Sequence, residues 1–276
     1  MKELEERSTR VYRQKQMFSK QELEERENVC IRDEPAFCSA ACPLKLDGRA
    51  FAKAIKEGDF SGARAQLERI APFPLILAHG CEAPCEGACR LSEKGEGVSI
   101  GALERACMAH GEKKAGRGLL KFKKKKTAAV FGADLFSLVL LGELAIKAYP
   151  VTFFCAEENA LAVIQKCAPY LGAAEARAES ERLFGMDINI EYGSELTRAF
   201  FEERRGGFDL ICASREFALS LSPNDEPNEV TLYSQKLGLV APLANTEGVL
   251  RSFYDARRAG VSLDRLAQNM DPATAR

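Results

Sequence analysis

The sequence lacks several features that would place it at once in a common class. Its 39 Lys and Arg almost balance its 40 Asp and Glu, so a net charge of −1 gives no global field that attracts nucleic acid or an anionic membrane. The first ten residues, MKELEERSTR, contain no apolar core of a signal peptide. No apolar run reaches the roughly 18 residues of a membrane span, because the longest candidate, 138–141, ends at Gly142 and Glu143. We therefore expect a cytoplasmic protein that binds no nucleic acid and does not insert into a membrane.

Cysteine, by contrast, is abundant and unevenly placed. Six of the ten cysteines lie within residues 30–89: Cys30, Cys38, Cys42, Cys81, Cys85 and Cys89. In a cytoplasmic chain such cysteines are metal ligands or buried thiols more often than disulfides. The repeated Cys-x3-Cys spacing lets a turn place several thiolates on one side of the chain, as an iron–sulfur cluster requires. Zinc and inert buried thiols are the alternatives, but the Cys-x2-Cys knuckle that zinc prefers does not occur.

Residues 18–110 resemble a known iron–sulfur family in both cysteine blocks. The segments CIRDEPAFCSAACP and CEAPCEGACRLSEKGEGVSIGALERA are similar to the N-terminal cluster domain of the glutamate synthase small subunit and of dihydropyrimidine dehydrogenase. That family holds two [4Fe–4S] clusters in a helical domain. Its first block reads Cys-x2-Cys-x4-Cys-x3-Cys-Pro, its second ends in Cys-x3-Cys, and a Glu or Gln in the next helix is the eighth ligand. The resemblance implies an all-α iron–sulfur domain over 1–115 with two [4Fe–4S] clusters.

The resemblance divides the candidate ligands into two sets. The first set is Cys30, Asp33, Cys38 and Cys89, and the second is Cys42, Cys81, Cys85 and Glu104. Asp33 stands where the family has its second cysteine, and a carboxylate is a harder ligand than a thiolate. An Asp-ligated [4Fe–4S] cluster, a three-iron cluster and a lost first cluster are all open, and the three persisting cysteines favour a retained cluster. For Glu104, an exposed helix carboxylate is the alternative to a ligand.

The other residues with reactive side chains are expected to be structural. Cys107 lies three residues after Glu104 on the same face of a predicted helix, where a buried thiol is favoured over a contact with the cluster. Three further cysteines lie in apolar segments and are assigned to the core: Cys155, Cys167 and Cys212. The two histidines, His79 and His110, are assigned no role.

The first half of the chain predicts short helices. Amphipathic patterns predict helices over 48–57 and 61–70, the second opened by Asp59 or Ser61 as a cap, and a third helix is expected over 100–111. The apolar stretch 71–80 is punctuated by prolines, so we expect a buried connector rather than a helix there.

The second half changes character after a Lys-rich segment. Residues 116–126 form a predicted linker, for which a solvated segment is favoured over a phosphate-binding or docking patch. Over 127–276, apolar strands alternate with helices, which predicts a parallel sheet with helices on its faces. The expected class is α+β overall, with an all-α domain followed by an α/β domain.

In the family, the cluster domain is followed by an FAD domain that opens with Gly-x-Gly-x-x-Gly, and residues 127–276 resemble it in layout. The corresponding segment, GADLFS, keeps only the first glycine, Gly132. Asp134 replaces the second glycine, so a carboxylate would lie where pyrophosphate approaches a helix, and it would cap that helix itself. Cys155 replaces the acidic residue expected for the ribose, and Leu243-Ala244 replaces a late Gly-Asp motif. The resemblance implies a degenerate Rossmann-like domain without FAD, and too little chain lies between FDLICAS and the segment that begins EVTLYSQKLG for an NAD(P)H domain.

Preserved cluster ligands beside an altered nucleotide site favour an electron-transfer subunit with no catalysis of its own. It would relay electrons through its clusters between partner subunits of a larger oxidoreductase. Two alternatives are open: a flavoenzyme that binds FAD in an altered mode, and a structural adaptor in which metal only stabilises the fold.

Overall fold

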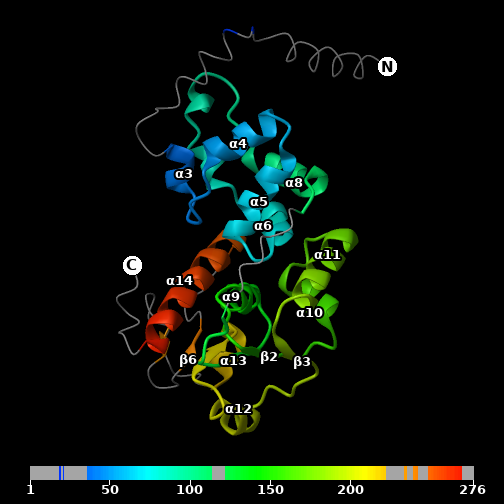
Figure 1. Ribbon diagram of the computed structural model, residues 1–276, viewed down its shortest axis with the longest axis vertical. Coiled ribbons are helices and arrows are strands. Elements are labelled where there is room, and N and C mark those ends of the chain that lie inside the picture. Colours follow the sequence, from blue (N-terminus) through cyan, green and yellow to red (C-terminus); the bar gives the residue numbers. More distant parts are fainter. Residues whose placement is uncertain are drawn as a thin grey trace.

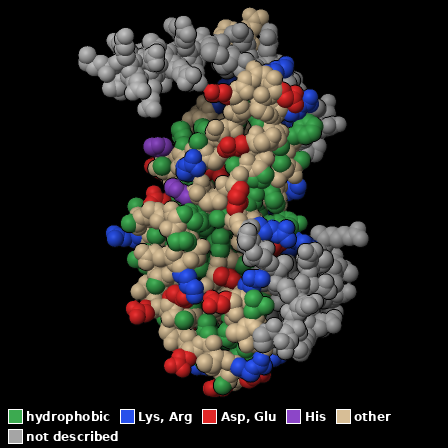
Figure 2. Space-filling model, turned by 180° about the vertical axis from the view of Figure 1, so that it is seen from behind, with side chains coloured by type: hydrophobic (Ala, Val, Ile, Leu, Met, Phe, Trp, Pro, Cys, Tyr) green, Lys and Arg blue, Asp and Glu red, His purple; other side chains and the backbone are tan. Residues whose placement is uncertain are grey.

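The computed structural model describes residues 19, 21, 36–113, 122–221, 233–234, 239–241 and 248–268. Residues 36–113 form a helical part, and the described residues from 122 onward form an α/β part. Figure 1 shows the helical part stacked on one end of the α/β part. On the reverse face, hydrophobic side chains gather at the waist where the two parts meet (Figure 2). The mixture of an all-helical part and an open sheet agrees with the expected α+β class.

The helical part consists of short helices joined by tight turns. They are α3 (Phe37–Ala41), α4 (Gly48–Lys56), α5 (Phe60–Ile70), α6 (Pro74–Gly80), α7 (Pro84–Gly87), the 3₁₀ turn η1 (Arg90–Glu93) and α8 (Ile100–His110). The carboxylates of Asp47 and Asp59 accept backbone N–H groups in the first turns of α4 and α5. The three helices predicted in this part are confirmed, with ends that differ by at most one residue.

Helix α6 contradicts the connector expected over 71–80. The segment is buried as expected, but Pro74 occupies the first turn of a helix, where its missing N–H costs no intrahelical bond. The Leu75 N–H group donates to Oε1 of Glu179 at 2.6 Å, from helix α11 (Ala173–Phe184) of the α/β part. A partner 104 positions away is invisible to a local pattern, so the prolines alone misled the prediction.

The α/β part is built on a mainly parallel sheet. Its strands are β1 (Ala128–Phe131), β2 (Val151–Phe154), β3 (Asn189–Glu191), β4 (Leu210–Ala213), β5 (Tyr233–Ser234) and β6 (Leu239–Val240). Their order is β3-β2-β1-β4-β6-β5, and only the β5–β6 pair is antiparallel. Along β1, Ala128 and Val130 join one core cluster while Ala129 and Phe131 join the other, as the period of two requires. The expected parallel sheet is therefore confirmed.

Helices cover both faces of this sheet. They are α9 (Leu135–Ile146), α10 (Ala160–Cys167), α11 (Ala173–Phe184), α12 (Arg198–Arg205), α13 (Arg215–Leu221) and α14 (Val249–Ala267). Apolar residues of α9, α10, α11 and α14 share one core cluster, whereas those of α12 and α13 belong to the other. On the second face the rings of Phe131 and Phe154 stack at 4.8 Å, and Phe201 and Phe217 close around them. The sequence patterns did not predict α13.

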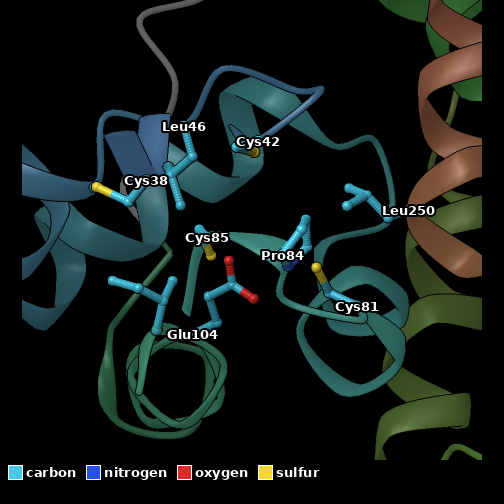
Figure 3. Close-up of a pocket in the computed structure, with 10 residues that line it drawn as sticks. Cys38, Cys42, Leu46, Cys81, Pro84, Cys85, Glu104 and Leu250 are labelled. Atoms are coloured by element: carbon cyan, nitrogen blue, oxygen red, sulfur yellow. The ribbon is translucent and has the colours of Figure 1, made fainter. Parts of the chain in front are cut away.

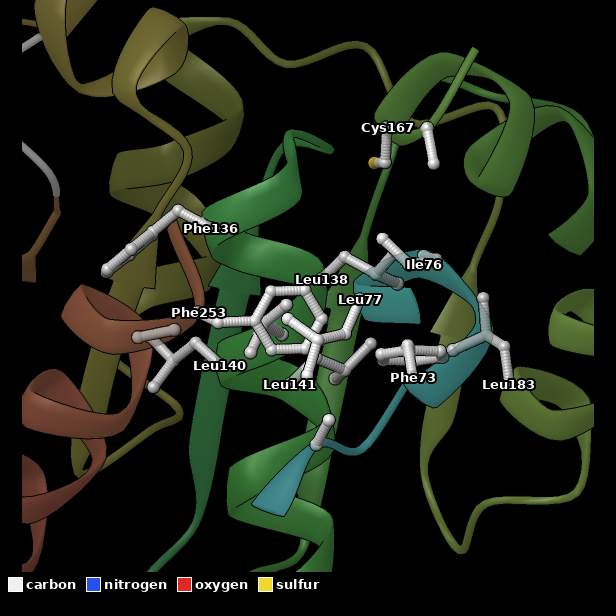
Figure 4. Close-up of a cluster of buried hydrophobic side chains, with 14 of the residues drawn as sticks. Phe73, Ile76, Leu77, Phe136, Leu138, Leu140, Leu141, Cys167, Leu183 and Phe253 are labelled. Carbon is white, nitrogen blue, oxygen red and sulfur yellow. The ribbon is translucent and has the colours of Figure 1, made fainter. Parts of the chain in front are cut away.

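One hydrophobic core continues from the helical part into the α/β part. Figure 4 shows Phe73, Ile76 and Leu77 of the α6 region packed among leucines of α9 and α11. The close approach needs Gly142 in α9, because a Cβ atom there would lie 2.4 Å from Cβ of Pro72. Helix α6 is thus the element through which the two parts share their core.

The basic residues at 122–126 are held against the α/β part. Nζ of Lys124 lies 2.5 Å from Oδ1 of Asp264, which also accepts the Tyr149 hydroxyl at 2.5 Å. Nζ of Lys123 lies 2.8 Å from a carboxylate oxygen of Asp187. These two lysines therefore make intramolecular ion pairs at the surface, where the Lys123 side chain stays 64% exposed. Residues 114–121 lie outside the described part, so the solvated linker stays a prediction. Among the described helices, none is long and apolar enough to cross a bilayer.

Candidate metal centre

A pocket in the helical part brings together one of the two predicted ligand sets. Its walls are Cys38, Cys42, Leu46, Gly48, Cys81, Pro84, Cys85, Ile100, Glu104 and Leu250. Figure 3 shows the carboxylate of Glu104 between the sulfurs of Cys81 and Cys85, with Cys42 above them. All four members of the second set, which are far apart in the sequence, therefore face one space.

Short helices and one sharp turn place these cysteines. Cys42 directly follows α3, Cys81 directly follows α6, and Cys85 lies in the first turn of α7 behind Pro84. Between the last two, Ala83 has a left-handed backbone with φ of 46°, which turns the chain back on itself. The Ala83 N–H group donates to Sγ of Cys81 at 3.4 Å. Hydrogen bonds of this kind stabilise a thiolate and help to set the potential of a cluster.

Glu104 is the least ordinary residue in the pocket. Its side chain is on α8, the residue is only 5% exposed, and its Oε2 atom has no hydrogen-bond partner among the described residues. Burial, reinforced by the nearby charge of Glu86, raises its pKa to about 7. A buried carboxylate oxygen without a donor is costly, and a bound cation removes that cost. The alternative reading of Glu104 as an exposed helix carboxylate is wrong.

The thiols of the pocket also need a cation to ionise. Burial raises the pKa of Cys81 to about 12 and that of Cys85 to about 11. Metal coordination deprotonates a thiol outright. Among the described residues, no three His, Cys, Asp or Glu side chains are close enough to bind a single ion. Three thiols and one carboxylate around one space are a donor set that fits a [4Fe–4S] cluster, because each ligand of such a cluster binds a different iron.

Only two residues of the other predicted ligand set, Cys38 and Cys89, belong to the described part of the chain. Cys38 lines the pocket, but its sulfur points away from Glu104 in Figure 3, and Cys89 is not part of the pocket wall. Cys30 and Asp33 lie outside the described residues, so the first set stays a prediction.

The remaining cysteines occupy the core, as expected. Cys107 is fully buried, donates its S–H to the carbonyl oxygen of Glu104 at 3.1 Å, and does not line the pocket. Cys155, Cys167 and Cys212 are buried within the core of the α/β part.

Two glutamates that the sequence patterns did not single out connect the cysteines to longer helices. Glu82 accepts the N–H groups of the first two residues of α14 at 2.5 and 3.0 Å. Oε1 of Glu86 accepts the N–H group of Gly101, in the first turn of α8, at 2.9 Å. Both follow a cysteine in CEAPCEGAC, and neither helix has a capping side chain at its own N-cap, Ser99 or Gly248. For α14 the glycine at the N-cap is a sequence signal that its cap comes from elsewhere, whereas Ser99 before α8 is a residue type that usually caps a helix and gives no such signal.

The altered glycine motif is built around Asp134. Gly132 has φ of 85°, and Asp134 and Ser137 form a reciprocal capping box at the start of α9. Oδ1 of Asp134 accepts the Ser137 N–H at 2.7 Å, and Oδ2 accepts the Arg215 N–H at 2.8 Å. The expected cap is confirmed, and the same carboxylate also caps α13. Leu243-Ala244 lies outside the described residues.

Comparison with known proteins supports the iron–sulfur interpretation of the first part of the chain. Residues 7–115 match the family model described as dihydropyrimidine dehydrogenase domain II, 4Fe–4S cluster. The chain is 29% identical over 119 residues to the NADPH-Fe(3+) oxidoreductase subunit beta of Geobacter sulfurreducens, covering 42% of this chain and 18% of that protein. It is 23% identical over 214 residues to the putative oxidoreductase YgfK of Escherichia coli K12, covering 74% and 20%. It is 32% identical over 100 residues to the NADP(+)-dependent formate dehydrogenase subunit beta of Moorella thermoacetica, covering 36% and 13%.

These matches cover a fifth or less of the length of each of these relatives. They support the iron–sulfur oxidoreductase family that the cysteine motifs indicate, and the matched family model supports at least one [4Fe–4S] cluster within residues 7–115.

Proposed function

We propose that this chain is an iron–sulfur electron-transfer subunit of a larger oxidoreductase. The main supporting observation is that Cys42, Cys81 and Cys85 share a pocket with Glu104, whose buried Oε2 atom has no hydrogen-bond donor among the described residues. A [4Fe–4S] cluster held there would accept and release single electrons. Each of the four side chains would bind one iron, and the pocket walls would exclude water from it. Two of the similar proteins are named as beta subunits of oxidoreductases, which supports a role within a complex.

A second cluster would be held by Cys30, Asp33, Cys38 and Cys89. Cys38 and Cys42 flank the same turn of α3, which would keep the two clusters close. The sulfur of Cys38 points away from the space that Glu104 faces, which supports assigning it to a separate cluster. Two neighbouring clusters would form a relay between partner subunits.

The α/β part would be a degenerate dinucleotide-binding domain that binds no FAD. The order β3-β2-β1-β4 matches the first four positions of the dinucleotide-binding order 3-2-1-4-5-6. Pyrophosphate binds in such sheets at the N-terminus of the first helix, but here Asp134 caps both α9 and α13. Its negative charge would repel phosphate, so the domain would serve as a scaffold and a docking surface.

An altered flavin site is the second candidate, favoured by Gly132. This glycine keeps the positive φ of a tight turn after β1. Extraction of the anaerobically purified complex separates the two candidates, because flavin absorbance that persists after cluster removal would favour the flavoenzyme.

The cluster proposal is tested by anaerobic purification, iron and sulfide analysis and EPR. We expect roughly eight irons and eight sulfides per chain if both cubane clusters are present. Glu104→Ala should change the EPR signal of one cluster, and Cys42→Ser should affect the same signal. Cys107→Ser is the matched control, because this thiol is buried beside Glu104 but does not line the pocket, and its spectrum should match the wild type. An iron-free wild-type protein would refute the proposal.

A further inference from the structure

The residue that follows Cys81 reaches out of the cysteine block to the start of α14. Oε1 of Glu82 accepts the Val249 N–H at 2.5 Å, and Oε2 accepts the Leu250 N–H at 3.0 Å. These are N–H groups of the first turn of α14, which have no partners within the helix. One carboxylate therefore satisfies two donors on a helix that begins 167 positions later in the chain.

Two glycines allow this contact to be close. Gly248 has φ of 96°, and a Cβ atom there would lie 2.6 Å from Oε1 of Glu82. At Gly80, a Cβ atom would lie 2.4 Å from the Tyr170 hydroxyl and 2.7 Å from Cγ2 of Val249. The Tyr170 hydroxyl in turn donates to the carbonyl oxygen of Ile76 in α6. The segment that presents Cys81 is thus packed against α14 on both sides of the cysteine.

Helix α14 also forms part of the pocket. Leu250 lines it beside Cys81, and the next buried apolar residues, Phe253 and Ala256, belong to the core shared with α9. Figure 1 shows α14 running from the helical part down along the α/β part. The position of Cys81 therefore depends on a helix whose own position is set by the α/β part.

The carboxylate of Glu82 and the N-terminus of α14 carry charges of opposite sign. The N-terminus of a helix carries a partial positive charge of about half a unit, and α14 directs that end at the pocket. The carboxylate of Glu82 neutralises it in place, directly beside Cys81. A cluster potential responds to local charge and to the hydrogen bonds around its sulfurs.

We infer that Glu82 is a positioning residue for the cluster held by Cys42, Cys81, Cys85 and Glu104. It fixes Cys81 to the start of α14 and sets the charge next to that ligand, so the α/β part controls both the retention and the midpoint potential of this cluster. The inference rests on the proposed cluster and adds a function for the α/β part that does not require a nucleotide.

The test uses the full-length holoprotein with two substitutions at Glu82. Glu82→Gln keeps one acceptor oxygen but removes the charge, so we expect a higher midpoint potential in an EPR-monitored redox titration, with the cluster largely retained. Glu82→Ala removes both hydrogen bonds, so we expect roughly fivefold faster cluster loss to a chelator, the factor that the loss of one helix cap implies. Hydrogen exchange at Val249 and Leu250 should also become faster in this variant.

Asp59→Asn is the matched control, because Asp59 caps α5 in the same part of the chain and does not line the pocket. It should leave the potential and the exchange at α14 unchanged. If the wild type holds its cluster and neither Glu82 variant changes the potential or the rate of cluster loss, the inference is wrong while the cluster proposal stands. If the wild type holds no cluster, the cluster proposal itself fails. Glu82→Gln alone decides the matter if the alanine variant does not fold.

Discussion

Replacing Asp134 should be more costly than replacing an ordinary helix cap. Its two carboxylate oxygens accept the N–H groups of Ser137 and Arg215 at 2.7 and 2.8 Å, so one side chain starts two helices. The Ser137 hydroxyl also accepts the Asp134 N–H at 2.9 Å, which fixes the turn between β1 and α9. Asp134→Ala removes both side-chain acceptors at once.

The expected magnitude follows from the two bonds. Loss of a single cap costs about 1 kcal/mol, so Asp134→Ala should lower the free energy of unfolding by about 2 kcal/mol. Asp134→Asn keeps one carbonyl oxygen, so it should lose one of the two bonds and about 1 kcal/mol. Asp59→Ala is the single-cap reference, because the Asp59 carboxylate accepts the Gly62 N–H in the first turn of α5.

Urea unfolding of the anaerobic holoprotein, followed by circular dichroism, measures these differences. The order of stability should be wild type, then Asp134→Asn together with Asp59→Ala, then Asp134→Ala, at an unchanged dependence on urea. If Asp134→Ala is no less stable than Asp59→Ala, the second cap contributes nothing. The reasoning that this carboxylate stabilises the starts of both helices would then be refuted.

Further predictions concern the shared core and the ion-pair network. Gly142→Ala should destabilise the protein by about 1–2 kcal/mol in thermal or urea unfolding, because its Cβ would lie 2.4 Å from Cβ of Pro72 and overpacking outweighs the helix propensity of alanine. Gly260→Ala is the control and should be neutral or stabilising by up to about 1 kcal/mol, since its nearest neighbour is a flexible lysine nitrogen at 3.4 Å; equal losses in both variants would contradict this. Burial opposes ionisation of Asp264, but hydrogen bonds from Lys124 and its neighbours outweigh it and hold the pKa at about 2, below the usual 3.8. Because this pKa is lowered, the carboxylate stabilises the fold above about pH 4 by about 2 kcal/mol, and roughly half of that is lost by pH 3. The stability difference between wild type and Asp264→Asn should shrink over this range, and a constant difference would show that the network does not hold the pKa down.

Local patterns predicted the elements whose signals are themselves local. Asp59 lies directly before the apolar pattern of α5, so the start of that helix could be predicted from a few residues. The strand and helix order of the α/β part followed from alternating apolar segments in the same way. Asp134 was also predictable as a cap, because it stands three residues before Ser137 at the start of an apolar helix.

Contacts between distant residues could not be predicted in this way. Two prolines near the start of α6 argue against a helix at the level of sequence. The helix is stabilised at its start by Glu179, a residue outside the segment 71–80. The second role of Asp134, at Arg215, also depends on how β1 and β4 pair in the sheet. The residues that share a pocket with Glu104 were predictable only because the spacing of the cysteines resembles a known family, not from the residues between them.

The continuous core at α6 has a consequence for how such chains can be recombined. The apolar side chains of Phe73, Ile76 and Leu77 find their partners in α9 and α11, and the start of α6 is satisfied from α11. A cluster segment transplanted into another protein would expose this surface unless the recipient supplied a matching groove and a carboxylate. The cysteine-rich segment therefore cannot be moved into another chain by itself. The helices that pack against α6 have to be transferred together with it.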